Sequence, residues 1–125
     1  MKYNMYRAEL YMEFSEDCTR METVSKEELH DKLTEFHYCA IIEKEHSTYQ
    51  IYCSDCIKNN SNLKKEKYHL KLDPVARVRF EGGLDEYEKL LEEIRMDYQD
   101  GKIYGKLRDG NAENDFLVVD IYFKM

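Results

Sequence analysis

Residues 75–98, VARVRFEGGLDEYEKLLEEIRMDY, carry the two clearest structural signals of this 125-residue chain. The apolar side chains at 76, 78 and 80 alternate with Arg77 and Arg79, and this period of two predicts a strand with one buried face. After the glycine pair at 82–83, apolar residues recur every three or four positions, which predicts an amphipathic helix that ends near Gly101. The segment therefore predicts a strand that leads into a helix.

The sequence on either side extends this pattern. Ser25 and Glu28 have the spacing of a capping box, and apolar residues at helical spacing follow as far as Phe36. The hairpin predicted around residues 44–47 has Ile41 opposite Ile51 and Cys39 opposite Cys53. Strands are predicted at residues 6–14, 37–43, 48–53, 68–72, 103–108 and 116–123.

Together these elements predict an α+β fold in a single domain of residues 1–125. We expect a mainly antiparallel sheet with two helices on one of its faces. The order strand, helix, strand, strand occurs twice along the chain, so a repeated β-α-β-β unit is one interpretation. Two unrelated units that share this order are the other, because residue identity between the two halves is slight.

The composition is that of a globular protein, with 42% apolar and 36% charged residues. The apolar stretches fall far short of the ~20 residues that span a membrane, and the N-terminus lacks the layout of a secretory signal. We therefore expect a cytoplasmic protein whose four cysteines are reduced thiols.

The net charge of −7 disfavours broad affinity for nucleic acids or membranes, but the charge is unevenly distributed. Residues 57–80 contain seven basic and two acidic residues and have a net charge of +5. The remainder of the chain therefore has a net charge of −12. The sequence predicts one basic ribbon that crosses an acidic body.

This basic ribbon is a candidate anion-binding or nucleotide-binding site. Cations interleaved with an aromatic side chain can hold phosphates and stack a base. The alternative is a charged edge strand, in which lysines prevent edge-to-edge pairing. The candidate anion-binding residues are Lys64, Lys65, Lys67, Tyr68, Lys71, Arg77 and Arg79.

A second candidate site is a zinc centre around the Cys53–Cys56 pair, which has CxxC spacing. Cys39 would lie across the hairpin from Cys53, and His37 is close in sequence, so these four residues would make a Cys3His site. In the alternative interpretation Cys39 and Cys53 are buried core thiols and no cofactor is bound.

Eleven tyrosines form the third feature, and four of them lie on the strand face opposite the expected core. Tyrosine is frequent in protein interfaces, because it adds a large contact area with a polar tip. A partner protein or a second copy of the chain could bind this face. The alternative is that tyrosine simply suits a half-exposed strand. The candidate partner-binding residues are Tyr11, Tyr52, Tyr104 and Tyr122.

Catalytic motifs are absent from the sequence, which has no P-loop, GxGxxG, GxSxG or HExxH pattern. We therefore expect a non-enzymatic interaction protein without assigned catalytic residues. In this hypothesis it is a phage or mobile-element inhibitor of a host defence protein that occludes the surface of its target. An acidic body can compete with nucleic acid for a basic groove. The alternatives are anion binding at the basic ribbon and a small enzyme with a site made of scattered residues.

Overall fold

The computed structural model describes residues 9–11, 13–18, 20–35, 40–53, 68–72, 75–97, 101–111 and 116–124. The helical elements are the 3-10 turn η2 (Lys26–Glu28), α1 (Leu29–Glu35) and α2 (Leu84–Asp97). The strands are β1 (Glu9–Tyr11), β2 (Phe14–Cys18), β3 (Arg20–Ser25), β4 (Ala40–Glu45), β5 (Thr48–Cys53), β6 (Tyr68–Leu72), β7 (Val75–Gly82), β8 (Ile103–Asn111) and β9 (Phe116–Lys124).

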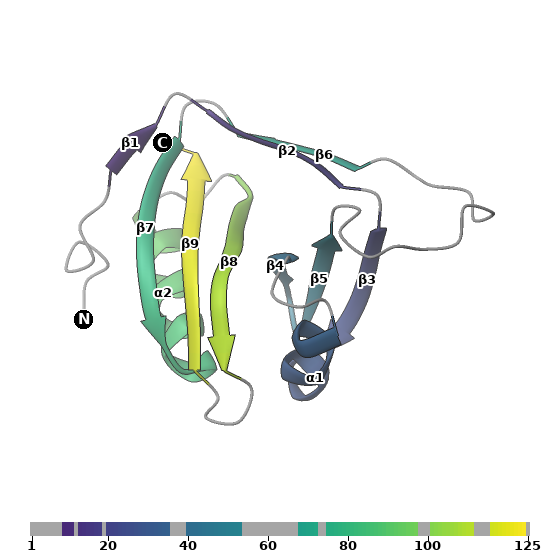
Figure 1. Ribbon diagram of the computed structural model, residues 1–125. Helices are drawn as coiled ribbons and strands as arrows, with labels where there is room; N and C mark the ends of the chain where they lie inside the picture. Colours follow the sequence, from purple (N-terminus) through teal and green to yellow (C-terminus); the bar gives the residue numbers. More distant parts are fainter. Residues whose placement is uncertain are drawn as a thin grey trace.

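The strands form one large antiparallel sheet and one small one. The seven-stranded sheet has the order β1-β7-β9-β8-β4-β5-β3, and β2 pairs with β6 in a separate two-stranded ribbon. Figure 1 shows this ribbon crossing one end of the large sheet. The predicted α+β class and the mainly antiparallel sheet with two short helices are confirmed.

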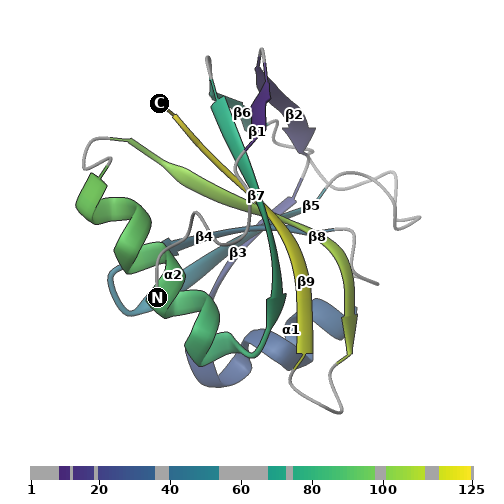
Figure 2. The ribbon, with the colours of Figure 1, turned by 90° about the vertical axis from the view of Figure 1, so that its left-hand side faces the viewer.

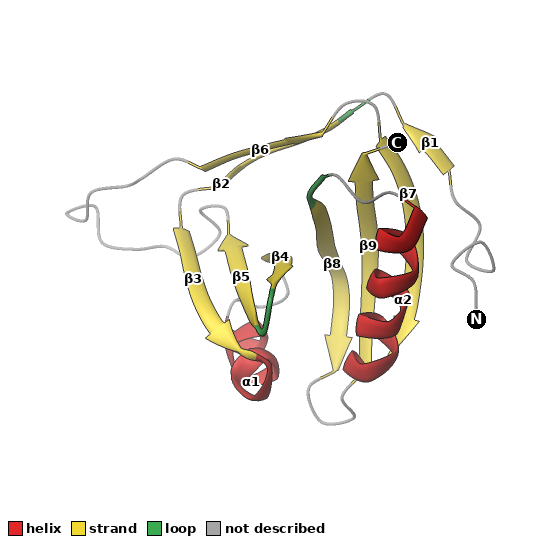
Figure 3. Cartoon of the chain, turned by 180° about the vertical axis from the view of Figure 1, so that it is seen from behind, coloured by secondary structure: helices red, strands yellow, loops and turns green. Residues whose placement is uncertain are grey.

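Both helices pack into one hydrophobic core. Leu29 and Leu33 of α1 belong to the same buried cluster as Tyr87 and Ile94 of α2 and as alternate residues of the strands. Figure 3 shows α2 lying along β7, β9 and β8. The packing is tight at Gly105, where a Cβ atom would come within 2.4 Å of the Tyr87 hydroxyl oxygen. A glycine is therefore required where α2 crosses β8.

A second core lies on the opposite face of the sheet, beneath the β2–β6 ribbon. Phe14 and Cys18 of β2 and Leu70 and Leu72 of β6 point toward the sheet and are buried, while the residues between them are more exposed. In Figure 2 this ribbon lies at the end of the molecule away from α1. The sheet therefore has an apolar core on each face.

The first predicted strand, residues 6–14, is wrong as a single element. The structure instead has β1, which pairs with the edge strand β7, and then β2, which leaves the large sheet to pair with β6. The strand β3 was also missed, because Arg20, Glu22 and Ser25 interrupt any apolar alternation in RMETVS. The predicted capping box is present: the Glu28 carboxylate accepts hydrogen bonds from the backbone N–H and the hydroxyl of Ser25.

The predicted hairpin exists but its register is shifted by one residue. Ile42, rather than Ile41, pairs with Ile51, and Ala40 pairs with Cys53. The turn contains only two residues and begins at His46, which has a φ of 55°. A shorter turn changes the pairing by one position, which moves the apolar residues of one strand to the other face.

Candidate functional site

The helical elements carry almost all of the net charge of the chain. Residues 26–35 and 84–97 contain ten acidic and four basic residues, for a net charge of −6 out of −7. Their apolar side chains pack into the core that both helices share, so the charged side chains face outward. We call this surface, made by residues 26–35 and the outer side of α2, the acidic helical face.

Two of its basic residues are already engaged within the same surface. Lys26 donates to Asp85 Oδ1 at 2.7 Å and to Glu88 Oε1 at 2.9 Å, which links η2 to α2. Lys32 lies 3.3 Å from the Glu35 carboxylate. The hydrogen bond and charge of Lys26 lower the pKa of Asp85, whose side chain remains 83% exposed. The Asp85 carboxylate is therefore ionised and open to solvent at neutral pH.

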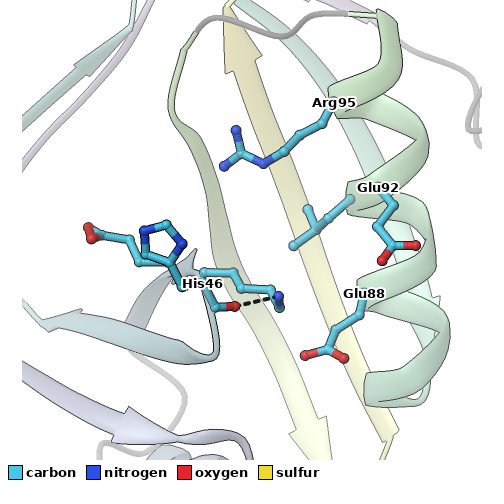
Figure 4. A pocket seen from close by; sticks show the side chains of 7 residues that line it. His46, Glu88, Glu92 and Arg95 are labelled. Atoms are coloured by element: carbon cyan, nitrogen blue, oxygen red, sulfur yellow. Dashed lines mark hydrogen bonds between the residues drawn. The ribbon is translucent and has the colours of Figure 1, made fainter.

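A cleft of about 410 Å³ separates the β4–β5 turn from α2. Figure 4 shows His46 across this cleft from Glu88, Glu92 and Arg95 of the helix. The Tyr49 hydroxyl donates to Glu88 Oε2 at 2.6 Å, which fixes this carboxylate at the cleft wall. Burial raises the pKa of Glu88, but the hydrogen bonds from Tyr49 and Lys26 outweigh it, and the net shift is downward. Such a carboxylate suits a cationic side chain better than proton transfer.

The outer side of α2 has a second hollow, of about 440 Å³, with an apolar end. Its lining includes Glu86, Glu92 and Glu93, and also Met96, which is 76% exposed. Methionine is flexible and adapts to irregular partner surfaces. The acidic helical face therefore combines charge with one apolar contact point.

The prediction that Tyr52 and Tyr104 lie on an open surface is wrong. Tyr52 and Tyr104 are only 6% and 3% exposed, because the β2–β6 ribbon covers them. Tyr122 is partly buried against the same cluster. Tyr11 belongs to β1, but its side chain lies outside the described part of the structure. Tyr52 and Tyr104 therefore form part of the second core, and Tyr122 packs against it.

The basic ribbon is only partly described. Lys64, Lys65 and Lys67 lie outside the described residues, and Tyr68 packs against the second core. Lys71 is exposed on β6, 3.7 Å from the Glu13 carboxylate. The other two described members, Arg77 and Arg79, lie on β7 of the large sheet, whereas Tyr68 and Lys71 lie on β6 of the small sheet. The described residues of the basic ribbon therefore do not form one continuous strip.

Arg77 and Arg79 of β7 both approach Asp120 of β9, a residue without exposed surface. Arg79 Nε donates to Asp120 Oδ1 at 2.5 Å, and Arg77 lies 3.7 Å from Oδ2. Arg108 of β8 also lies 3.7 Å from Oδ2. We call these four residues the arginine cluster. Sequence reasoning missed Arg108, although a lone aspartate within the apolar strand FLVVDIYFK could have indicated a buried charge pair.

The zinc hypothesis concerns residues that are mostly outside the described ranges, namely His37, Cys39 and Cys56. Cys53 is described and lies in the main core, 1% exposed. Within the described ranges, no cluster of three or more histidine, cysteine or acidic side chains could hold a metal ion. Cys18 is likewise buried, and burial with the nearby charges of Glu16 and Asp17 raises its pKa to about 11. Its thiol is therefore unreactive at neutral pH.

Among the described residues, Glu43 is a second buried carboxyl group besides Asp120, 4% exposed on the face of the second core. The Tyr52 hydroxyl lies 3.1 Å from Glu43 Oε1 and 2.9 Å from Gln50 Oε1, and its single proton can be donated to only one of them. Burial raises the pKa of Glu43, against the opposing effects of Lys102 and the hydrogen bond from Tyr52. A protonated Glu43 would donate to Tyr52 and satisfy the group.

This environment predicts a pH effect on stability. Because the pKa of Glu43 is higher in the folded state than its ordinary value of 4.5, protonation favours the fold. That contribution is complete below pH 4.5 and is lost as the pH rises through the folded-state pKa. Glu43→Gln should therefore gain stability relative to wild type as the pH rises through the folded-state pKa of Glu43. Thermal unfolding from pH 4 to 8 measures this, with exposed Glu13→Gln as control, and an unchanged difference between Glu43→Gln and wild type contradicts it.

Comparison with known proteins gives one match. The model of a protein family matches residues 5–125 of the chain. The chain belongs to DUF5975. DUF5975 is a family of unknown function, so membership assigns no activity. No curated protein and no solved structure matches the chain significantly. Within the described residues of this DUF5975 protein, no helix is long and apolar enough to cross a membrane.

Proposed function

We propose that this DUF5975 protein is a non-enzymatic interaction protein that binds a basic partner surface through its acidic helical face. The observation that carries the proposal is the net charge of −6 on the two helical segments, which face outward on one side of the sheet. In this role it acts by occlusion and covers a groove that would otherwise hold nucleic acid. A phage or mobile-element inhibitor of a host defence protein has this chemistry.

The described contacts support a binding role for this face. Asp85 is 83% exposed and Glu35 61% exposed, so both carboxylates can reach a partner. The Met96 side chain supplies apolar area near Glu92 and Glu93 on the outer side of α2. Complementary charge accelerates association and sets orientation, while a partly apolar contact point contributes to affinity.

We also propose that the fold consists of two related halves, β2–β3–α1–β4–β5 and β6–β7–α2–β8–β9. Each half contributes three adjacent strands in the order first, third, second, and the short strands β2 and β6 pair with each other. Glu28 accepts from the backbone N–H of Ser25, and Glu86 accepts likewise from Gly83, each at 3.3 Å. In this plan α1 and α2 are equivalent, and each half supplies one acidic helix to the same face.

Charge reversal on this face tests the proposed function. The triple variant Asp31→Lys, Glu35→Lys and Glu92→Lys changes exposed residues of both helices. The matched control, Glu13→Lys, Asp17→Lys and Glu81→Lys, makes the same change in net charge on exposed residues outside the acidic helical face. We expect the helical variant to bind a partner captured from native host lysate at least about tenfold more weakly than wild type.

The control variant should retain the partner with near wild-type affinity and the same salt dependence. Both variants should unfold at similar temperatures, because surface substitutions change stability by only about 0.5 kcal/mol each. Equal binding by the two variants would show that the acidic helical face is not the contact surface.

A further inference from the structure

The arginine cluster lies on the face of the sheet opposite α2, where it forms a second polar surface. Arg79 and Arg108 flank the buried Asp120 from the two neighbouring strands, and their side chains are 42% and 54% exposed. Figure 1 looks onto this face of β7, β9 and β8, with α2 behind it. Three guanidinium groups share one carboxylate, so the cluster has an excess of two positive charges.

The arrangement holds the arginines in place without using all of their donors. Asp120 Oδ1 accepts from Nε of Arg79, which is one of the five N–H groups of that guanidinium. Asp120 Oδ2 is buried without a hydrogen bond, and its contact to Arg108 is an ion pair at 3.7 Å. A preorganised guanidinium with exposed N–H groups matches the geometry of a phosphate.

A β-bulge lies at Arg108. The β8–β9 register shifts between Leu107 and Asp109, so that Arg108 is the extra residue in β8. Such bulges redirect a side chain and are frequent next to functional sites. Tyr104 and Lys106 pair with Tyr122 and Asp120, so alternation along β8 also directs Arg108 to the face of Asp120.

An exposed aromatic side chain lies on β9, on the same face of the sheet as Asp120. Phe116 is 40% exposed and stands four residues before Asp120 on β9, which at ~3.3 Å per residue is about 13 Å along the strand. Along β9 only Val118 lies between them on that face, and the exposed Glu81 of β7 pairs with Val118. An exposed aromatic ring next to cationic side chains can stack a base whose phosphate the cations hold.

We propose that the arginine cluster and Phe116 bind a phosphate group that carries an unstacked base, as in a free nucleotide or single-stranded nucleic acid. Arg79 and Arg108 hold the phosphate, and Phe116 stacks the base. This site is independent of the acidic helical face, because it lies on the other side of the sheet. It also differs from the basic ribbon, since it omits the lysines and includes Arg108 and Phe116.

Fluorescence anisotropy with two labelled probes, ATP and an oligouridylate of about 12 nucleotides, tests the proposal. We expect wild type to bind at least one probe, and the probe bound distinguishes a free nucleotide from a single strand. Arg79→Gln and Arg108→Gln should each weaken binding by about tenfold or more. Phe116→Ala should weaken binding of the probe about tenfold and leave competition by inorganic pyrophosphate unchanged.

The matched control is Lys89→Gln, which removes an exposed cation from α2 and should not change binding. Arg79→Lys keeps the charge but loses the planar donor pair, so it should bind less tightly than wild type. Thermal unfolding of each variant reports whether it folds. The proposal is overturned if wild type binds neither probe. It is also overturned if Lys89→Gln loses as much affinity for the probe as Arg79→Gln and Arg108→Gln do.

Discussion

Tyr104→Ala should lower the free energy of unfolding by about 4 kcal/mol, the largest effect expected of any single substitution discussed for this protein. Tyr104 is 3% exposed beneath the β2–β6 ribbon. Its ring stacks on Phe14 with a centroid distance of 5.5 Å and meets the edge of Tyr52 at 6.3 Å. Truncation would leave a cavity between the ribbon and the sheet, which neither side can close without moving strands.

Chemical denaturation monitored by circular dichroism measures this change. Tyr104→Phe keeps the ring and should cost less than about 1 kcal/mol. Phe116→Ala, a truncation of a 40% exposed ring, is the control for loss of aromatic area and should cost less than about 1.5 kcal/mol. A loss near 1 kcal/mol for Tyr104→Ala would mean that the ribbon does not cover the sheet in solution.

Asp120→Asn should lower the free energy of unfolding by about 3 kcal/mol. The substitution keeps the size of the side chain and removes the charge that balances Arg77, Arg79 and Arg108. Breaking a buried ion pair from one side leaves the remaining charges uncompensated. Two of the three arginines are substantially exposed, so we expect the lower end of the range for such pairs.

The double variant Asp120→Asn with Arg79→Gln separates charge from packing. If charge imbalance is the cause, removing Arg79 as well should restore about 1 kcal/mol or more of the loss. The control is Glu81→Gln, which changes an exposed carboxylate on β7, the strand that carries Arg79. It should change stability by less than about 0.5 kcal/mol. Additive losses in the double variant would contradict an electrostatic role for Asp120.

Much of the fold could be predicted from local pattern. The alternation in VARVRFE and the apolar stripe of residues 84–97 correctly predicted β7 and α2, because each element buries one face against the same core. The Ser25–Glu28 capping box also predicted the start of the first helical segment. These signals are local, and each follows from one element alone.

The β2–β6 ribbon could not be predicted in this way, because its two strands are about 50 residues apart in sequence. Alternation along β5 and β8 places Tyr52 and Tyr104 on the face away from the helices, but it does not say whether that face is covered. The charged residue Glu16 hides the pattern in FSEDC, although Lys106 neutralises it at 2.8 Å. The predicted open tyrosine face was wrong for this reason.

The candidate sites could not be predicted for the same reason, because each depends on contacts between segments that are far apart in sequence. The net charge follows from the sequence, but its concentration on one face depends on both helices packing on the same side of the sheet. The arginine cluster requires the β7–β9–β8 register, which is set by pairing between strands. Pairing of this kind has no signature within a single segment.

Hydrogen exchange on the complex with the captured partner tests most directly whether the acidic helical face is the contact surface. Backbone amides are compared between the free protein and the complex. We predict that binding slows exchange in residues 26–35 and 84–97 and at the His46 turn, and leaves β2 and β6 unchanged. Protection confined to the β2–β6 ribbon or to the arginine cluster, with unchanged exchange in both helices, would contradict the account.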